Sequence, residues 1–299
     1  MKQTQSQSLP VSAMVAGLNE AHLLDACLSS LDFCDEILYT DLGSSDESLQ
    51  IARKYGARVF QNERVPSSEY VQSKRLADLK HEWFIFIDPD EHITEPLKQM
   101  LTAEFEQLQS QTQIGVVSVP WLFYIKGHQL QGTVWGDNRK YLLAHRDRFT
   151  IDPVTHYGRK LHADFLCRDI PLNAARSNFL HHNWMPGYRV FLRKHLRYLK
   201  KEGSDRYDLG LRMSREALWQ VPLREFKHSY FERHGNLHGF LGLFLSAFWA
   251  YYQTHASLSL YHHQERIKRE KERLKLQKKK ASDKKKRKKK KTLAPAPDR

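Results

Sequence analysis

The chain has 299 residues, and 40% of them are hydrophobic, which is enough for a sizeable buried core. This composition excludes a wholly disordered or fibrous protein. The formal net charge is +14, but residues 264–299 hold 18 Lys and Arg against 5 Asp and Glu, so 13 of those charges lie in this tail. Because the rest of the chain is nearly neutral, we expect no nucleic-acid surface on the folded body and no specific nucleic-acid partner.

Three cysteines, Cys27, Cys34 and Cys167, show no metal-ligand spacing, and residues 1–10 contain no apolar signal segment. We interpret them as buried thiols of a reduced, cytoplasmic protein. No stretch reaches the ~20 apolar residues that a membrane-spanning helix needs.

The first half of the chain alternates β-rich runs with helical patterns, which predicts parallel β-α-β units. In chain order we expect strand 11–16, helix 20–31, strand 36–40, helix 44–56, strand 58–60, helix 69–80 and strand 83–87. The last of these is a continuous apolar run, typical of a central strand that is covered on both faces. Further strand-like runs follow to residue 149, and the second half is mainly helical. The sequence therefore predicts an α/β fold with a mostly parallel central sheet flanked by helices.

Acidic residues follow two of the predicted strands. Asp41 ends the second strand, and the sequence Asp88-Pro89-Asp90-Glu91 follows the central one. Ligands of open α/β sheets bind at the carboxyl ends of the strands. Two carboxylates at positions i and i+2 suit Mg²⁺ or Mn²⁺, which prefers oxygen ligands and bridges diphosphate oxygens. The alternative is that Asp88 and Asp90 cap a helix that begins near residue 94.

Several well-known site motifs are missing from the sequence. There is no G-x-x-x-x-G-K-[ST] and no G-x-G-x-x-G, so no motif indicates a P-loop or a dinucleotide-binding site. There is also no G-x-S-x-G and no H-E-x-x-H, which argues against a serine hydrolase or a zinc protease of these types.

Five segments, in their order and spacing, resemble family 2 glycosyltransferases, and within them the bacterial lipopolysaccharide-core glucosyltransferase group. They are VSAMVAGLNE (11–20), CLSSL (27–31), DEIL (35–38), DLGSSD (41–46) and DPDE (88–91). The likeness covers about residues 9–263. It implies a GT-A fold, a nucleotide-diphosphate sugar as donor, inversion at the anomeric carbon, and a lipid-linked saccharide acceptor in lipopolysaccharide-core or other surface-glycan assembly.

The resemblance also implies roles for individual residues. It assigns donor binding to Asn19, Glu20, Asp41, Asp46, Lys74 and Asp88, and a Mg²⁺ or Mn²⁺ ion to Asp88 and Asp90. Asp90 is expected to be the main metal ligand, with the metal acting as a Lewis acid on the departing diphosphate. Lys74 is expected on a helix, where the alternative is an ordinary solvated cation. Ala21 and Tyr157 stand where related enzymes commonly have Glu, so the pocket is altered at these points.

An inverting transfer needs a base to take the proton of the attacking hydroxyl. Asp137 is the first candidate and His156 the second, while Asp137 is alternatively a turn residue. His181 and His182 are interpreted either as acceptor or phosphate ligands or as satisfied histidines near the core.

We divide the chain into a flexible N-terminus (1–8), a GT-A domain (9–233) whose nucleotide half ends near residue 110, an apolar helical segment (234–263) and the basic tail (264–299). The apolar segment carries Leu241, Phe244, Leu245, Phe248, Trp249 and Tyr252 at helical spacing. This stripe either packs against the body or lies at a membrane surface.

The tail is expected to be helical at first and then disordered, and to be attracted to anionic lipid. This would hold the protein peripherally on the inner face of the cytoplasmic membrane. Two alternatives stay open. One is a non-catalytic module of the same fold that binds nucleic acid or ribosomes through its tail, and the other is a protein glycosyltransferase.

Overall fold

The computed structural model describes residues 8–65, 67–153, 158–185 and 187–292, with side chains up to residue 280. The main sheet contains β1 (Leu9–Gly17), β2 (Cys34–Asp41), β3 (Arg58–Gln61), β4 (Trp83–Ile87), β5 (Glu91–Ile93), β6 (Ile114–Ile125), β7 (His128–Gln129), β8 (Asn138–His145), β11 (Leu166–Asp169) and β12 (Leu180–Met185). A smaller sheet pairs β9 (Phe149–Ile151) with β10 (Arg159–Leu161).

The helices are α1 (Ala21–Ser29), α2 (Ser48–Lys54), α3 (Glu69–Arg75), α4 (Glu95–Leu108), α5 (Tyr188–Asp208), α6 (Arg215–Lys227) and α7 (Gly239–Thr292). Three short helical segments of other types are the 3-10 helices η1 (Leu76–Asp78) and η3 (Gly235–His238) and the π-helix η2 (His228–Glu232). The predicted elements of the first half are all present. The helix predicted at 44–56 begins later, at Ser48, because residues 43–46 form a loop. The helix predicted at 69–80 ends at Arg75 and continues as the separate turn η1.

The strands of the main sheet run in the order β3-β2-β1-β4-β8-β6-β12-β5, with β7 and β11 also pairing with β6. Strands β3, β2, β1 and β4 are parallel to one another, and β12 is parallel to β6. Strand β8 is antiparallel to both β4 and β6, and β5 is antiparallel to β12. The predicted α/β fold with helices flanking a central sheet is confirmed; the sheet is parallel from β3 to β4 and mixed as a whole.

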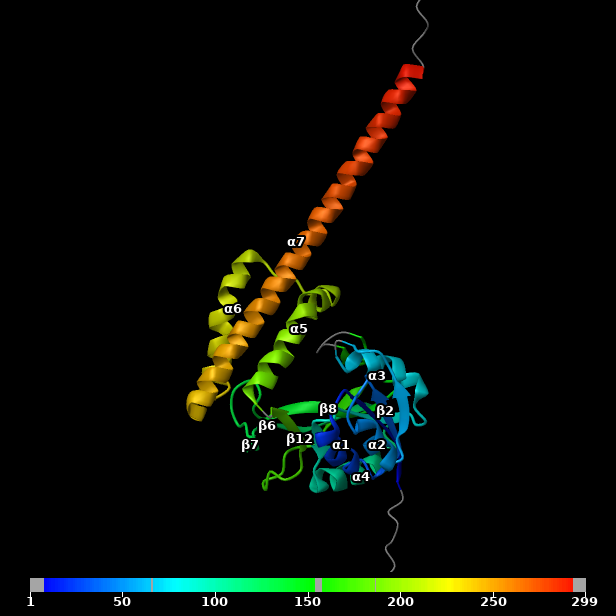
Figure 1. Cartoon of the computed structure of the whole chain (residues 1–299), viewed down its shortest axis with the longest axis vertical. Coiled ribbons are helices and arrows are strands. Elements are labelled where there is room, and N and C mark those ends of the chain that lie inside the picture. The colour runs from blue at the N-terminus through cyan, green and yellow to red at the C-terminus, as the bar shows by residue number, and fades with distance from the viewer. Residues whose placement is uncertain (1–7, 66, 154–157, 186, 293–299) are drawn as a thin grey trace, which may run out of the picture.

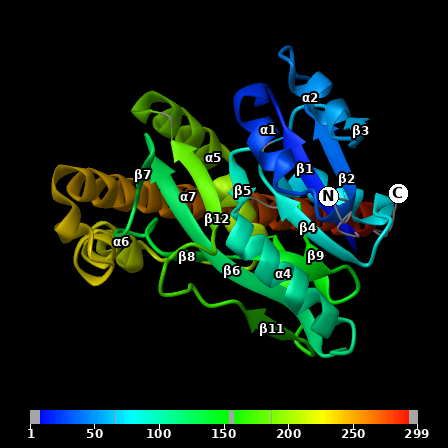
Figure 2. The ribbon, with the colours of Figure 1, turned by 90° about the horizontal axis from the view of Figure 1, so that it is seen from below.

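The sequence of strand β4 is an unbroken apolar run because both faces of this central strand are covered. All five of its residues are buried. Trp83, Ile85 and Ile87 join the core on the face that α1, α2 and α4 cover (Figure 2). Phe84 and Phe86 point to the opposite face and join the core with β9 and the η1 region. Because successive side chains alternate between faces, both cores depend on this one strand.

The apolar stripe on α7 packs against the body. Leu245, Phe248 and Tyr252 are buried in a third core, together with aromatic residues of β6, β12 and α5. The indole N–H of Trp249 donates to Glu225 of α6 at 3.0 Å. The first half of α7 therefore lies between α5 and α6, as Figure 1 shows. Among the described residues, no helix is long and apolar enough to cross a bilayer.

The predicted boundary at residue 264 does not coincide with the end of a helix. Helix α7 runs through it without a break, and its later part projects away from the body (Figure 1). The side chain of Gln264 still contacts the body, because it accepts from the backbone N–H of Met213 at 3.1 Å. Gln264 thus still belongs, in structural terms, to the part of α7 that contacts the body.

Candidate active site

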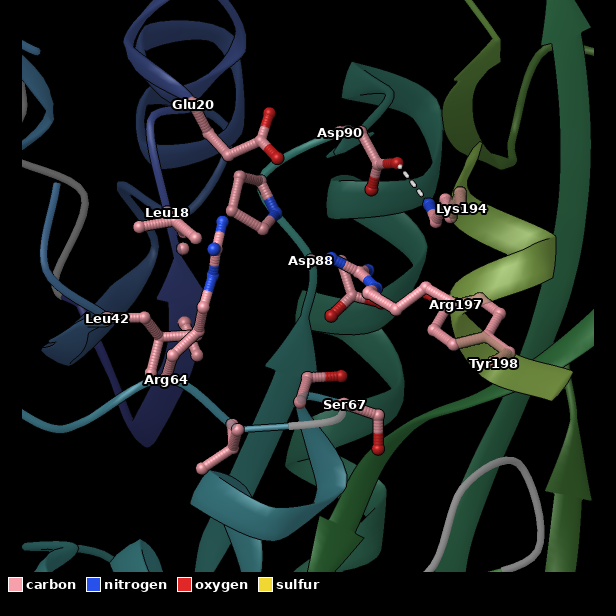
Figure 3. A pocket seen from close by; sticks show the side chains of 15 residues that line it. Leu18, Glu20, Leu42, Arg64, Ser67, Asp88, Asp90, Lys194, Arg197 and Tyr198 are labelled. Carbon is pink, nitrogen blue, oxygen red and sulfur yellow. Dashed lines mark hydrogen bonds and ion pairs between the residues drawn. The ribbon is translucent and has the colours of Figure 1, made fainter. Parts of the chain in front are cut away.

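The carboxyl ends of β1, β2 and β4 meet at one edge of the sheet. Gly17 is paired with Asp41 in the register of β1 and β2, and Val15 is paired with Ile87 of β4. The turn of Asp88 to Asp90 therefore begins one residue beyond this edge. A cavity of about 230 Å³ opens there. Its lining residues come from β1, the β3–α3 loop, the acidic turn and α5, as Figure 3 shows.

The carboxylate of Asp90 faces a lysine and a histidine. Its Oδ2 lies 3.2 Å from Nζ of Lys194 on α5 and 3.3 Å from Nε2 of His182 on β12. Burial opposes ionisation of Asp90, but Lys194 and His182 outweigh it and hold its pKa well below the usual range. Burial likewise acts against the charge of Lys194, and Asp90 outweighs it and raises the lysine pKa. Both groups are therefore charged at neutral pH.

Asp88 is held by a second buried lysine. Nζ of Lys140 on β8 lies 3.9 Å from Oδ2 of Asp88 and forms a closer ion pair with Glu91. Glu91 in turn accepts a hydrogen bond from the backbone N–H of Asp88 at 2.9 Å. Burial works against the ionised form of Asp88, but Lys140 and Arg159 outweigh it and lower its pKa. This network fixes the turn and keeps its acids ionised.

Glu20 differs from the two aspartates because its pKa is raised to about 7. Burial is the main cause, and the neighbouring carboxylate of Asp90 adds to it, while Lys194 acts in the opposite direction. Glu20 lines the cavity opposite the residues of α5 (Figure 3). A third carboxyl group that is partly protonated near pH 7 thus faces the same space.

The loop after β2 uses its acids to hold its own backbone. The buried carboxylate of Asp41 accepts from the backbone N–H groups of Gly43 and Ser44 at 3.1 and 3.2 Å. Asp46 accepts from the backbone N–H of Ala21 at 3.0 Å and so tethers the start of α1. Asn19 has a positive φ of 58°, and its Oδ1 accepts from the N–H of Ser45 at 2.7 Å. Asp41 and Asp46 shape this edge of the cavity without lining it.

Other predicted site residues lie elsewhere. Lys74 is exposed on α3 and does not line the cavity. Asp137, before β8, has a φ of 40° and pairs with Arg176 at 2.7 Å. His156 lies outside the described residues. His181 stacks on Tyr124 with ring centroids 3.8 Å apart, and burial lowers its pKa to about 4, so it is a neutral histidine of the sheet surface.

The sequence patterns did not assign a role to the cations that the fold brings to the acidic turn. Lys194 and Arg197 on α5 and Arg64 in the β3–α3 loop all line the cavity. The signal that was available is the spacing of basic residues along α5, which places several on one face of the helix. Lys140 gave no such signal, because its partner Glu91 is 49 residues away in the sequence.

A second cavity of about 400 Å³ adjoins the first. Asp88, Lys194 and Tyr198 line both, so the two spaces are continuous. The walls of the second cavity are mainly aromatic: Trp121, Phe123, Trp135, Trp184, Trp249 and Tyr252. Three polar residues, Asn138, Arg139 and Glu202, also line it. Mostly apolar walls with a few polar groups are typical of sites for small molecules.

The acidic turn fits a hard divalent cation that shares its ligands with a substrate. Asp88 and Asp90 supply ionised oxygens next to the cavity, the donor type that Mg²⁺ and Mn²⁺ prefer. In the described part of the chain, no cluster of three or more acidic, His or Cys side chains forms a complete protein site. Diphosphate and water oxygens would have to complete the coordination, as is usual for Mg²⁺ in phosphate-transfer sites.

Comparison with known proteins finds glycosyltransferases among the proteins that resemble this chain. The chain is 26% identical, over 264 residues, to the lipopolysaccharide core biosynthesis glycosyltransferase LpsC of Rhizobium meliloti, covering 83% of this chain and 94% of LpsC. It is 31% identical over 91 residues to an uncharacterized glycosyltransferase of Rickettsia bellii, covering 29% of this chain and 30% of that protein. No protein-family model matches the chain.

Solved structures give weaker similarities. Glucosyl-3-phosphoglycerate synthase of Mycobacterium tuberculosis has a TM-score of 0.46 at 16% identity, covering 68% of this chain and 81% of that one. S. aureus TarS has a TM-score of 0.40 at 13% identity, covering 78% of this chain and 46% of that one. The likeness to LpsC extends over most of both chains. Together with the acidic turn at the carboxyl edge of the sheet, it supports the resemblance to GT-A glycosyltransferases that the sequence motifs indicate.

Proposed function

We propose that the chain is an inverting, metal-dependent glycosyltransferase of family 2 that moves a sugar from a nucleotide-diphosphate donor to a lipid-linked saccharide in lipopolysaccharide-core or surface-glycan assembly. The observation that carries this proposal is the turn of Asp88 and Asp90, which borders a charged cavity that continues into an aromatic one. The charged side suits a diphosphate and the aromatic side suits sugar rings. The name of LpsC supports the choice of acceptor.

Asp88 and Asp90 would hold Mg²⁺ or Mn²⁺. When bound, such a cation neutralises the charge that develops on the departing diphosphate. The residues of the chain would do the rest of the binding. Lys194, Arg197 and Arg64 line the same cavity and are placed to pair with phosphate oxygens. Glu20, Asn19 and the loop shaped by Asp41 and Asp46 would bound the nucleoside.

The acceptor hydroxyl needs a base beside the aromatic cavity. Asp137 remains our proposed base, because it immediately precedes Asn138 and Arg139, which line that cavity. Arg176 forms an ion pair with its carboxylate at 2.7 Å, which holds the side chain in place. His156 is the second candidate.

The protein would act at the inner face of the cytoplasmic membrane. The basic end of α7 would be attracted to anionic lipid, at about 1 kcal/mol per cation near the surface. Exposed apolar side chains on α6, η2, η3 and the start of α7 would add a contribution that salt does not screen: Trp219, Leu223, Phe231, Leu237 and Phe240.

The test is a screen of nucleotide sugars by thermal shift, with and without Mn²⁺, on the full-length protein. A ligand that binds the native state raises the melting temperature. We expect one nucleotide sugar to do so in a Mn²⁺-dependent way, and Asp90→Asn to abolish this while the unliganded variant still unfolds cooperatively. If Asp90→Asn keeps Mn²⁺-dependent donor binding, the metal role is refuted. If no nucleotide sugar binds but RNA binds tightly at physiological salt, the non-catalytic alternative is correct.

A further inference from the structure

A third and larger cavity lies beside the first one, along α5. It is a groove of about 900 Å³ between α1 and α5. Six cations line it, Arg64, Arg189, Arg193, Lys194, Arg197 and Lys200, against only two acids, Glu20 and Asp90. The groove is therefore strongly positive although the body as a whole is nearly neutral.

Most of these cations have no acidic partner. Among the described residues, no Asp or Glu forms an ion pair with Arg64, Arg189, Arg193 or Lys200, whereas ion pairs are frequent elsewhere on the surface. Asp90, one of the two acids in the groove, is already engaged by Lys194 and His182. The acidic side chains that the structure describes therefore do not neutralise the positive charge of the groove.

The spacing of these residues along α5 brings like charges close together, which raises the free energy of the empty groove. Arg189, Arg193 and Arg197 follow one another at intervals of four, and Lys200 lies three residues further on. Like charges at this spacing lie on one helix face and repel one another. An anion in the groove would remove the repulsion, and arginine side chains can each present two N–H groups to one phosphate.

The groove also differs from the space proposed for the donor. Arg64, Lys194 and Arg197 line both cavities, but Arg189, Arg193 and Lys200 line the groove alone. A donor diphosphate at Asp88 and Asp90 would leave these three cations unmatched. Since the shared residues join the two spaces, an anion in the groove would belong to a molecule that also reaches the reacting centre.

We propose that this groove binds a phosphate group carried by the acceptor saccharide, with Arg189, Arg193 and Lys200 as its specific contacts. The proposal rests on the proposed function in one respect, namely that the second substrate is a saccharide. Arg64 and Arg197 face both substrates and would keep the two anionic groups adjacent. The chemistry recognised is a phosphate monoester on a sugar, so an uncharged acceptor of the same structure would bind more weakly.

The test is residue-resolved labelling of arginines in the full-length protein with phenylglyoxal, read out by mass spectrometry. Arg189, Arg193 and Arg197 are exposed and therefore open to the reagent, and Arg215 on α6 is an exposed reference outside the groove. With glucose 1,6-bisphosphate as probe, we expect labelling of the three groove arginines to slow about fivefold while Arg215 is unchanged. Glucose should protect none of them.

A matched pair of variants on α5 adds a second measurement. Arg193→Gln should raise the concentration of glucose 1,6-bisphosphate needed to protect Arg189 about tenfold. Lys201→Gln removes the same charge from an exposed position that lines neither cavity, and should leave that concentration unchanged. Equal shifts in the two variants would refute a specific site and indicate general electrostatic attraction.

Three further arms separate the possible sources of the anion. Protection of Arg189 and Arg193 by phosphatidylglycerol vesicles but not by the sugar bisphosphate would overturn the proposal in favour of a lipid site. Protection of both by UDP, GDP or ADP with Mn²⁺ would show that the groove belongs to the donor, which also refutes it. If nucleotide sugar binds normally but the bisphosphate does not protect these arginines, only the phosphate site in the groove is refuted. If the bisphosphate protects them but no nucleotide sugar binds, the proposed function is refuted and a sugar-phosphate site remains.

Discussion

Replacing Lys194 with Gln should change metal binding and nucleotide binding in opposite directions. Nζ of Lys194 lies 3.2 Å from Oδ2 of Asp90. At an effective dielectric constant of ~20, two unit charges at this distance attract by about 5 kcal/mol before desolvation is counted. A divalent cation on Asp90 must compete with this ammonium group. His182 still contacts Asp90 in the variant, so the carboxylate does not lose all its partners.

We therefore expect Lys194→Gln to tighten Mn²⁺ binding in the absence of nucleotide by about tenfold, or ~1.4 kcal/mol. This is only a fraction of the attraction between Lys194 and Asp90, because solvent screens the rest. The same variant should bind the nucleotide sugar more weakly, because it lacks a cation for the phosphates. Electron paramagnetic resonance titration measures free Mn²⁺ directly, and calorimetry measures the nucleotide. Lys201→Gln is the matched control and should alter neither value. Unchanged or weaker Mn²⁺ binding in Lys194→Gln would refute the argument that Lys194 opposes the metal.

Three other predictions concern separate parts of the molecule. Asp137→Asn should leave donor binding intact and lower turnover by ~10²–10⁴-fold, the usual contribution of a general base, and an unchanged rate in a steady-state assay would transfer the role to His156. Because the pKa of Glu20 is raised from 4.5 to about 7, the folded protein binds this proton more tightly than the unfolded chain, so its stability should fall as pH rises from about 4.5 through 7. Glu20→Gln should remove this fall in stability, so the variant should be more stable than the wild type by about 1–3 kcal/mol at pH 8 but not at pH 4. Urea denaturation at the two pH values measures this difference. Equal pH dependence of the two proteins would contradict the prediction. Removing residues 275–299 leaves the contact of Gln264 with Met213 intact, so donor binding should persist while attachment to anionic vesicles weakens. In sedimentation assays, the attachment of the full-length protein should fall as salt rises. Loss of donor binding on truncation would show that the tail belongs to the catalytic fold.

The elements of the first half were predictable because their signals are local. The alternation of Trp83 to Ile87 between two cores is encoded in five adjacent residues, and Gly56, at a φ of +69°, follows α2 as a helix-ending glycine should. The position of the acidic turn then followed from the rule that strands of a parallel sheet end at one edge.

The cationic half of the site was not predictable in the same way. Lys194 reaches Asp90 across 104 positions of sequence, and Lys140 reaches Glu91 across 49. Such pairs depend on how helices and strands pack, and no local pattern records them. The choice between packing and membrane contact for the apolar stripe of α7 was likewise a tertiary question, decided by the aromatic residues of β6, β12 and α5 that meet it.

The length of α7 has a mechanical consequence. Residues 266–292 continue the helix beyond the last contact that Gln264 makes with the body, and at 1.5 Å per residue they form a rod of about 40 Å. If a lipid surface bound the far end of this rod, the height of the two cavities above that surface would depend on the tilt of the helix. An upright rod would place the cavities beside the outer sugars of a long glycan, and a flat one would bring them down to sugars next to the lipid. The helix would thus act as a spacer that sets how far from the surface the enzyme can reach.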